Sequence, residues 1–260
     1  MIGANDLTFL GTRGEIELRS RRHRRHSSLL IRKGGARIMI DCGADWLGRV
    51  RTIAPTAIVL THAHPDHAAG LAEGAPCPVY APRRTLDLIG RYPIELRRIF
   101  IRRATDIGGV RFKAIAVQHS IRAPAVGYRV STGGRTFFYA PDIARLPNPA
   151  HALRGVDIYV GDGATVLRPL VRDRDGTLIG HASIAEQLRW CAEAGVRRAI
   201  FTHCGSPIVR GNARKLNAQV RQLGRQRGID ASIACDNDKL DFVRKEDDER
   251  KTTVGGQPHR

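Results

Sequence analysis

The stretch Ile58–His67, IVLTHAHPDH, is the most informative part of this chain, because it holds three histidines and an aspartate directly after an apolar run. Its three apolar residues, Ile58–Leu60, predict a buried strand, and Thr61–His67 reads as the loop that leaves the strand's C-terminal end. Loops at strand ends are where binding sites are built. Imidazole and carboxylate suit zinc, manganese or iron as ligands. The loop therefore predicts a site for two neighbouring metal ions, with ligands from His62, His64, Asp66 and His67.

Residues 62–67, HAHPDH, resemble the HxHxDH motif of the metallo-β-lactamase fold hydrolases. The resemblance implies an α/β fold of four layers, an αββα sandwich of two mixed sheets with helices outside and the site along one edge. We expect one domain over residues 1–243, because no repeat or linker divides them. Residues 244–260 are charged and nearly devoid of apolar side chains, so we expect a disordered tail there.

Length and composition bound the class of protein. A chain of 260 residues with 42% hydrophobic content buries a sizeable core. The opening lacks a basic segment followed by an apolar one, and no stretch approaches the roughly 18 apolar residues of a membrane span. The five cysteines are an odd number, widely scattered, so reduced thiols are expected. These features predict a soluble, cytoplasmic protein with no membrane partner.

The formal net charge of +18 favours a polyanionic partner or a phosphorylated substrate. Arginine makes up 37 of the 43 basic residues, however, and such a skew also arises from the nucleotide composition of a genome. A local cluster, RSRRHRRH over residues 19–26, is either a solvated loop or a nucleic-acid contact through Arg19, Arg21, Arg22, Arg24 and Arg25. The surrounding FLGTRG…RHSSLLI resembles the opening of ribonuclease Z-like and cyclic phosphodiesterase-like members of the superfamily.

Later strand ends supply the remaining metal-ligand candidates. The alternating segment Val110–Val117 leads to His119, a hairpin over residues 125–140 leads to Asp142, and Ala199–Thr202 leads to His203. The resemblance gives one ion His62, His64 and His119, and the other ion Asp66, His67 and His203. It assigns Asp142 the bridging position, where an anion lets two cations lie about 3.5–4 Å apart. The expected cofactors are two divalent ions, zinc first, with manganese or iron as alternatives, and Asp41 is expected to support the metal loop.

His181 lies in GHAS, residues 180–183, just before an expected helix. Ser183 and Glu186 match the capping box S-x-x-E. Helix N-termini bind anions through free N–H groups and the helix dipole. The segment resembles the GHST or GHM segment of the phosphodiesterase branch, which implies that His181 contacts the scissile phosphate. A loop histidine at a helix entrance is the alternative.

These residues together predict a metal-dependent phosphodiesterase that attacks with a metal-bound hydroxide. The catalytic candidates are Asp66, which binds metal and orients the nucleophile, and His181, which stabilises the phosphoryl charge or protonates the leaving group. The expected substrate is a cyclic ribosyl phosphate, a nucleotide or a short RNA or DNA. Gly163 stands where ribonuclease Z relatives have a relay glutamate, and Asp142 follows His119 by only 23 residues, which leaves no room for a tRNA-gripping arm.

Two other functions stay open. A lactonase or thioesterase could use the same dinuclear centre, with His181 incidental. A non-catalytic basic protein could bind nucleic acid through the arginine cluster. The oligomeric state is also open, with a homodimer as one option.

Overall fold

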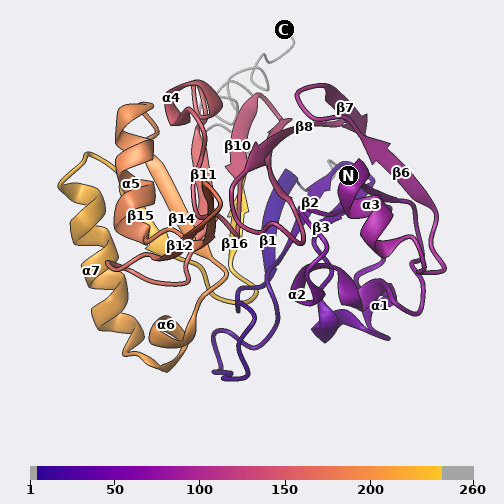
Figure 1. Cartoon of the computed structure of the whole chain (residues 1–260), viewed down its shortest axis with the longest axis horizontal. Helices are drawn as coiled ribbons and strands as arrows, with labels where there is room; N and C mark the ends of the chain where they lie inside the picture. The colour runs from indigo at the N-terminus through magenta and orange to yellow at the C-terminus, as the bar shows by residue number, and fades with distance from the viewer. Residues whose placement is uncertain (1–4, 242–260) are drawn as a thin grey trace, which may run out of the picture.

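The structure is a computed structural model that describes residues 5–241. The expected disordered tail, residues 244–260, lies outside the described residues, as does the domain boundary at residue 243. Two seven-stranded mixed sheets face each other at the centre of the molecule, and helices cover their outer faces (Figure 1). The four-layer αββα architecture is therefore confirmed.

The first sheet has the order β16–β1–β2–β3–β4–β5–β6. Its strands are β1 (Asn5–Gly11), β2 (Ser28–Lys33), β3 (Ala36–Ile40), β4 (Ala57–Val59), β5 (Val79–Pro82), β6 (Leu96–Ile99) and β16 (Lys239–Asp241). The second sheet has the order β15–β14–β11–β10–β9–β8–β7. Its strands are β7 (Ala104–Ile107), β8 (Val110–Val117), β9 (Ala125–Thr132), β10 (Arg135–Tyr139), β11 (Ile158–Asp162), β14 (Arg198–Thr202) and β15 (Asp230–Ile233). A separate hairpin pairs β12 (Leu170–Arg174) with β13 (Thr177–His181).

The helices divide between the two outer layers (Figure 1). The first sheet is covered by α1 (Val50–Ile53), α2 (Pro65–Ala68), α3 (Arg83–Ile89) and the 3₁₀ turns η1 (Ala44–Trp46) and η2 (Ala69–Leu71). The second sheet carries α4 (Pro149–Ala152), α5 (Ile184–Glu193), α6 (Ser206–Arg210) and α7 (Ala213–Arg225). No helix in the described part of the chain is long and apolar enough to cross a membrane.

Three apolar clusters fill the spaces between the four layers. The central cluster includes Leu7, Ile31, Phe112 and Phe137 from the facing surfaces of the two sheets. A second cluster lies under α5 and α7, and a third lies under α1 to α3. Strand β8 illustrates why apolar side chains gather between the layers. Its sequence, VRFKAIAV, alternates between buried and more exposed positions along most of its length, so that one face of the strand enters the core.

The expected elements differ from the structure mainly at their ends. The helix after the metal loop begins at Pro65, because proline at the first helical position needs no N–H partner. Pro82 caps α3. The sequence interpretation missed β12 and β13 entirely, since β12 is mostly exposed and lacks an alternating pattern of apolar residues.

Strand direction positions the site. Strands β3, β4, β5 and β6 run parallel, as do β10, β11, β14 and β15. Strand β8 points the same way as β10, because both are antiparallel to β9. The C-terminal ends of β8, β10, β11 and β14 therefore lie at one edge of the second sheet. These strand ends, together with the loop after β4 of the first sheet, carry the candidate ligands and Asp162, the last residue of β11.

Candidate metal centre

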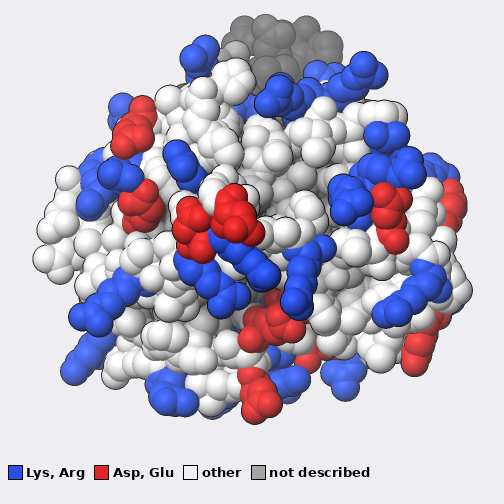
Figure 2. Space-filling view, in the orientation of Figure 1, with Lys and Arg blue, Asp and Glu red and all other residues white. Residues whose placement is uncertain are grey.

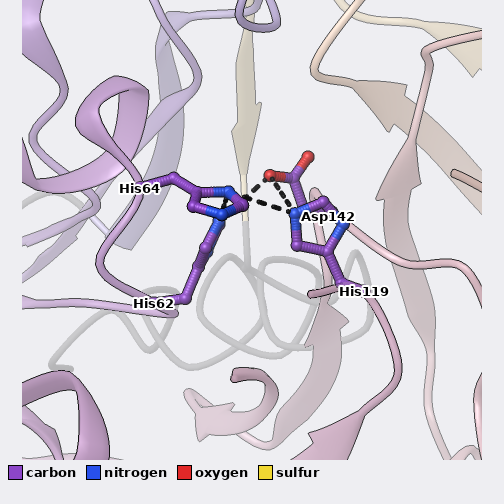
Figure 3. A group of neighbouring side chains, drawn as sticks. All are labelled: His62, His64, His119 and Asp142. Carbon is purple, nitrogen blue, oxygen red and sulfur yellow. Dashed lines mark hydrogen bonds and ion pairs between the residues drawn. The ribbon is translucent and has the colours of Figure 1, made fainter. Parts of the chain in front are cut away.

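Among the described residues, three overlapping groups of histidine and aspartate side chains could hold a metal ion, and the third consists of Asp142, Asp162, His181 and His203. His62, His64, His119 and Asp142 form the first of the two clusters expected from the sequence (Figure 3). Nδ1 of His64 lies 3.0 Å from Nε2 of His62 and 3.3 Å from Nε2 of His119. Oδ2 of Asp142 lies 3.3 Å from Nε2 of His62 and 3.4 Å from Nε2 of His119. Three ring nitrogens and a carboxylate oxygen thus converge on one small volume.

The second cluster joins Asp66, His67 and His203 to the same Asp142. Nε2 of His67 lies 3.1 Å from Oδ2 of Asp66 and 3.0 Å from Oδ2 of Asp142. His203 reaches Oδ2 of Asp66 with Nε2, at 3.0 Å, and Oδ1 of Asp142 with Nδ1, at 2.8 Å. Asp142 therefore lies between the clusters, and all seven residues expected as ligands are brought together.

Partners outside the clusters fix how two of the imidazoles present their nitrogens. Oδ2 of Asp41 lies 2.9 Å from Nδ1 of His67, and Oδ1 of Asp41 accepts a hydrogen bond from the Thr61 N–H. Nδ1 of His119 lies 3.0 Å from the Gly180 carbonyl. A carboxylate or carbonyl oxygen only accepts hydrogen bonds, so both Nδ1 atoms must be protonated. In the neutral rings Nε2 then carries a lone pair that faces the cluster, as metal-ligating histidines require.

Buried polar atoms without hydrogen bonds test whether these residues fit a metal ion. Among the described residues, Oδ1 of Asp66, Nε2 of His67, Oδ1 of Asp142 and Nδ1 of His203 are buried and make none. The atoms in His203 and Asp142 are nevertheless only 2.8 Å apart. Their relative orientation, not their distance, therefore excludes a hydrogen bond between them. Leaving such groups unpaired is costly, and a divalent cation in each cluster would satisfy them.

The pKa shifts of the clustered side chains indicate that positive charge is stabilised at this site. Burial, reinforced by the nearby His67, holds the pKa of His62 well below its usual value, which keeps this ring neutral. Burial alone would raise the pKa of Asp142, but the surrounding imidazoles outweigh it and hold that pKa well below its usual value. For His203 burial lowers the pKa, yet Asp142 and Asp66 raise it to about 10. The ionised carboxylates thus draw positive charge to the site, which protons or metal cations can supply.

His181 lies beside the second cluster and is held by Asp162. Its Nδ1 is 2.8 Å from Oδ2 of Asp162 and 3.8 Å from Oδ1 of Asp142, and its ring stacks on His203 with centroids 5.4 Å apart. Asp162 is fully buried and also accepts hydrogen bonds from the Ile143 and Ala164 N–H groups. The His181 side chain remains 24% exposed, so part of the ring is accessible from outside the site.

Gly163 explains why the relay glutamate is missing. A Cβ atom at this position would lie 2.5 Å from the Thr202 carbonyl oxygen, a distance that real side chains do not tolerate. The N–H of Gly163 donates to that same carbonyl. The position therefore accepts no side chain.

The sequence interpretation missed Gln187 on α5. Its side-chain oxygen accepts hydrogen bonds from the Tyr159 hydroxyl, at 2.9 Å, and from the Asp162 N–H, at 2.8 Å, while its nitrogen donates to the Asp162 carbonyl. Gln187 thus fixes the backbone of the residue that orients His181. Its position offered a signal, because it falls within the apolar stripe of Ile184, Leu188 and Cys191, where a polar residue needs a buried partner.

The basic segment over residues 19–26 contains both side chains that contact the protein interior and side chains that are exposed to solvent. His23 is buried and contacts Thr12, and His26 contacts Asp45, which also pairs with the buried Arg13 at 2.6 Å. Arg19 pairs with Asp45 at 2.8 Å. The exposed members without an ion-pair partner among the described residues are Arg21, Arg22 and Arg24, while Arg25 lies over the Trp46 ring. The two histidines therefore contact the protein interior, whereas Arg21, Arg22 and Arg24 face solvent.

Comparisons with known proteins follow this geometry. Residues 36–204 match the family model described as the beta-lactamase superfamily domain. A ribonuclease Z from Mycobacterium marinum is 27% identical over 253 residues, covering 79% of this chain and 88% of that protein. Two solved structures share the fold. The metallo-beta-lactamase fold protein YhfI from Bacillus subtilis has a TM-score of 0.72 at 18% identity, covering 90% of this chain and 98% of that one. A diphosphatase from the PhnP family has a TM-score of 0.71 at 22% identity, covering 91% and 96%.

The family match extends over more than half of the chain and contains every candidate ligand, from His62 to His203. The alignment with ribonuclease Z adds a relative from the expected branch, over most of both chains. The chain therefore belongs to the beta-lactamase superfamily.

Proposed function

We propose that this protein is a dinuclear metal-dependent hydrolase that cleaves phosphodiesters. The observation that carries the proposal is the arrangement of His181, held by Asp162 directly beside two clusters of ligand atoms that share Asp142. The kinship with ribonuclease Z supports a phosphodiester as the bond attacked. The substrate class is a cyclic ribosyl phosphate, a nucleotide or a short RNA or DNA.

His62, His64 and His119 would hold one ion, Asp66, His67 and His203 the other, and Asp142 would contact both. When bound, the ions supply Lewis acidity and lower the pKa of water toward neutrality. Histidine-rich ligand sets of this kind favour zinc, with manganese or iron as alternatives. Metal analysis of the purified protein decides between them.

The residues of the chain supply positioning and proton transfer. Oδ1 of Asp66 is buried without a hydrogen bond, so it is available to orient the attacking water. Asp162 accepts from Nδ1 of His181, which leaves Nε2 to donate a proton to the leaving oxygen. Positive charge on this ring also stabilises the extra negative charge of the phosphoryl transition state.

His181→Ala tests the proposal. On bis-p-nitrophenyl phosphate, a cyclic ribose phosphodiester and a short RNA, we expect the variant to lose about 10²–10⁴-fold in kcat. The matched control is His151→Ala, because His151 is an exposed histidine of α4 outside both clusters. If the wild-type protein leaves all three phosphodiesters intact and instead hydrolyses a lactone or thioester, with His181→Ala still active, the assignment is wrong.

Arg21, Arg22 and Arg24 are the members of the basic segment that we propose for contact with a nucleic acid substrate, because they are exposed and without ion-pair partners among residues 5–241. Free thiols at all five cysteines support a cytoplasmic location. The homodimer option has a separate test, sedimentation velocity.

A further inference from the structure

The hairpin of β12 and β13 presents one face to the candidate metal centre. Leu170 pairs with His181, Arg172 with Ile179 and Arg174 with Thr177. Alternate residues of a strand share a face, and so do directly paired residues. Leu170, Arg172 and Arg174 therefore form a row on the face that also carries His181. The row begins at the site and runs toward the hairpin turn.

A cleft of about 500 Å³ lies along this face. His64 and His119 line it at the end nearest the metal centre, and Arg122, Arg172 and Arg174 line the rest. The walls also expose apolar surface, since Leu170 is 57% and Ile121 is 48% exposed. Arginines beside exposed apolar side chains match the mixed charged and apolar surface of a nucleotide.

The three arginines are free for a ligand. None of them forms an ion pair with another described residue. Asp173 lies between Arg172 and Arg174 in the sequence, but strand alternation turns it to the other face, where it accepts from the Gly176 N–H at 2.9 Å. Both signs of charge accordingly appear near the centre of the molecule in Figure 2, over the region where Figure 1 places β12.

The hairpin is anchored to a candidate ligand loop. The Gly180 N–H donates to the His119 carbonyl at 2.9 Å, and Nδ1 of His119 donates back to the Gly180 carbonyl at 3.0 Å. The arginine row is therefore fixed relative to the first cluster. Fixed charges at a set distance from a reacting centre select substrates by where their own charges lie.

We propose that this cleft binds the sugar-phosphate backbone of nucleotides next to the scissile bond, so that the preferred substrate is a single-stranded oligonucleotide with further phosphates. The inference rests on the proposed function. Arg172 and Arg174 are about 7 Å apart along the strand, comparable to the spacing of successive phosphates in an extended nucleic acid strand. Arg122, in the loop after β8, also lines the cleft, and Leu170 and Ile121 offer surface to the bases.

The test combines Arg172→Gln and Arg174→Gln in one variant and compares two substrates. Bis-p-nitrophenyl phosphate carries only the scissile phosphate, whereas a five-nucleotide single-stranded RNA carries additional ones. We expect kcat/KM on the RNA to fall at least 10-fold, mainly through KM, and kcat/KM on bis-p-nitrophenyl phosphate to change less than twofold. The control is Arg221→Gln with Arg225→Gln, which removes the same charge from α7, outside the cleft.

A binding measurement separates this inference from the proposed function. Fluorescence anisotropy with a labelled five-nucleotide RNA needs no turnover, and removing two phosphate contacts should reduce the salt slope of log K by about 1.4. If no phosphodiester is hydrolysed but the Arg172/Arg174 variant loses affinity and slope, the cleft stands and the proposed function falls. If RNA is hydrolysed but the variant equals the α7 control in both assays, the cleft assignment is overturned and the proposed function stands.

Discussion

Asp41 shows how one side chain outside the ligand set shapes the centre. It is fully buried, with a backbone φ of 62°, and its carboxylate contacts both the Thr61 N–H and Nδ1 of His67. The first contact fixes the start of the metal loop, and the second fixes the His67 tautomer. We expected this supporting role from the sequence, and the observed contacts agree with it.

Asp41→Asn should weaken metal binding by about 10–100-fold, because the amide no longer enforces the His67 tautomer or raises its basicity. Competition with a chromogenic chelator measures this affinity. Asp6→Asn is the matched control, since Asp6 is a buried aspartate that pairs with Arg32 on the first sheet. Equal affinity in Asp41→Asn and the wild-type protein would show that Asp41 does not support the ligands.

At the level of secondary structure, the pairing of β12 with β13 depends on the glycine near the end of β13. Gly180 has a φ of 108°, and a Cβ there would lie 2.0 Å from the Leu170 carbonyl oxygen. Glycine alone fits both the backbone conformation and the close approach of the paired strand. The contacts between Gly180 and His119 depend on this geometry.

Gly180→Ala should destabilise the protein by more than Gly176→Ala, as measured by urea unfolding. Gly176 in the hairpin turn also has a positive φ, of 75°, but a Cβ there meets open space. The control thus carries only the backbone strain, about 1 kcal/mol, whereas Gly180→Ala adds the clash with Leu170 and should cost roughly 2–4 kcal/mol. A smaller loss for Gly180→Ala than for Gly176→Ala would contradict the steric argument.

At the scale of the whole molecule, the clusters join the two halves of the sandwich. His62, His64, Asp66 and His67 follow β4 of the first sheet, whereas His119, Asp142 and His203 follow strands of the second. Ions held between them would link the two sheets. Without them, the buried carboxylates depend on protonated imidazoles for compensation.

Metal binding should therefore raise the melting temperature. At a free metal concentration about 100-fold above Kd, binding contributes about 2.7 kcal/mol, which corresponds to roughly 5–10 °C for a chain of this size. Differential scanning fluorimetry of chelator-treated protein, before and after zinc addition, measures the shift. Elemental analysis should give two ions per wild-type chain and fewer in His62→Ala, and an unchanged melting temperature would argue against resident metal.

Global stability should also fall in acid because of His23. Burial first, and then the charge of Arg22, lowers the pKa of His23 to about 4 in the folded protein, against 6.5 for an ordinary histidine. The unfolded chain therefore takes up the proton first, so the stability that His23 contributes is present above pH 6.5 and is lost as the pH falls toward 4. The loss is about 3 kcal/mol.

Urea unfolding at pH 7 and at pH 4 checks this, with His23→Gln as the comparison because glutamine retains a donor and does not titrate in this range. The wild-type protein should lose about 3 kcal/mol more than the variant between these values. The exposed His151 offers a control, since His151→Gln should leave the pH dependence of the wild-type protein in place. Parallel curves for wild type and His23→Gln would refute the assignment.

The resemblance of the HxHxDH motif to a known family predicted the sandwich and the ligand set. The strand ends that carry these ligands and the helix cap after His181 follow from local patterns, because an apolar strand, the loop that leaves it and a helix cap each occupy a few consecutive residues. Strand β8 and the Ser183 cap show this, since β8 has the expected limits and Ser183 accepts the Glu186 N–H.

Contacts between residues far apart in the sequence became visible in the three-dimensional structure alone. Gln187 supports Asp162 across 25 residues, and Gly163 excludes a side chain because of Thr202. His23 is buried, while its neighbours Arg22 and Arg24 are exposed. The arginine cleft likewise depends on a mostly exposed hairpin held by His119. Such contacts depend on packing between segments far apart in the chain. A local sequence pattern does not indicate which distant residue will pack against a given side chain.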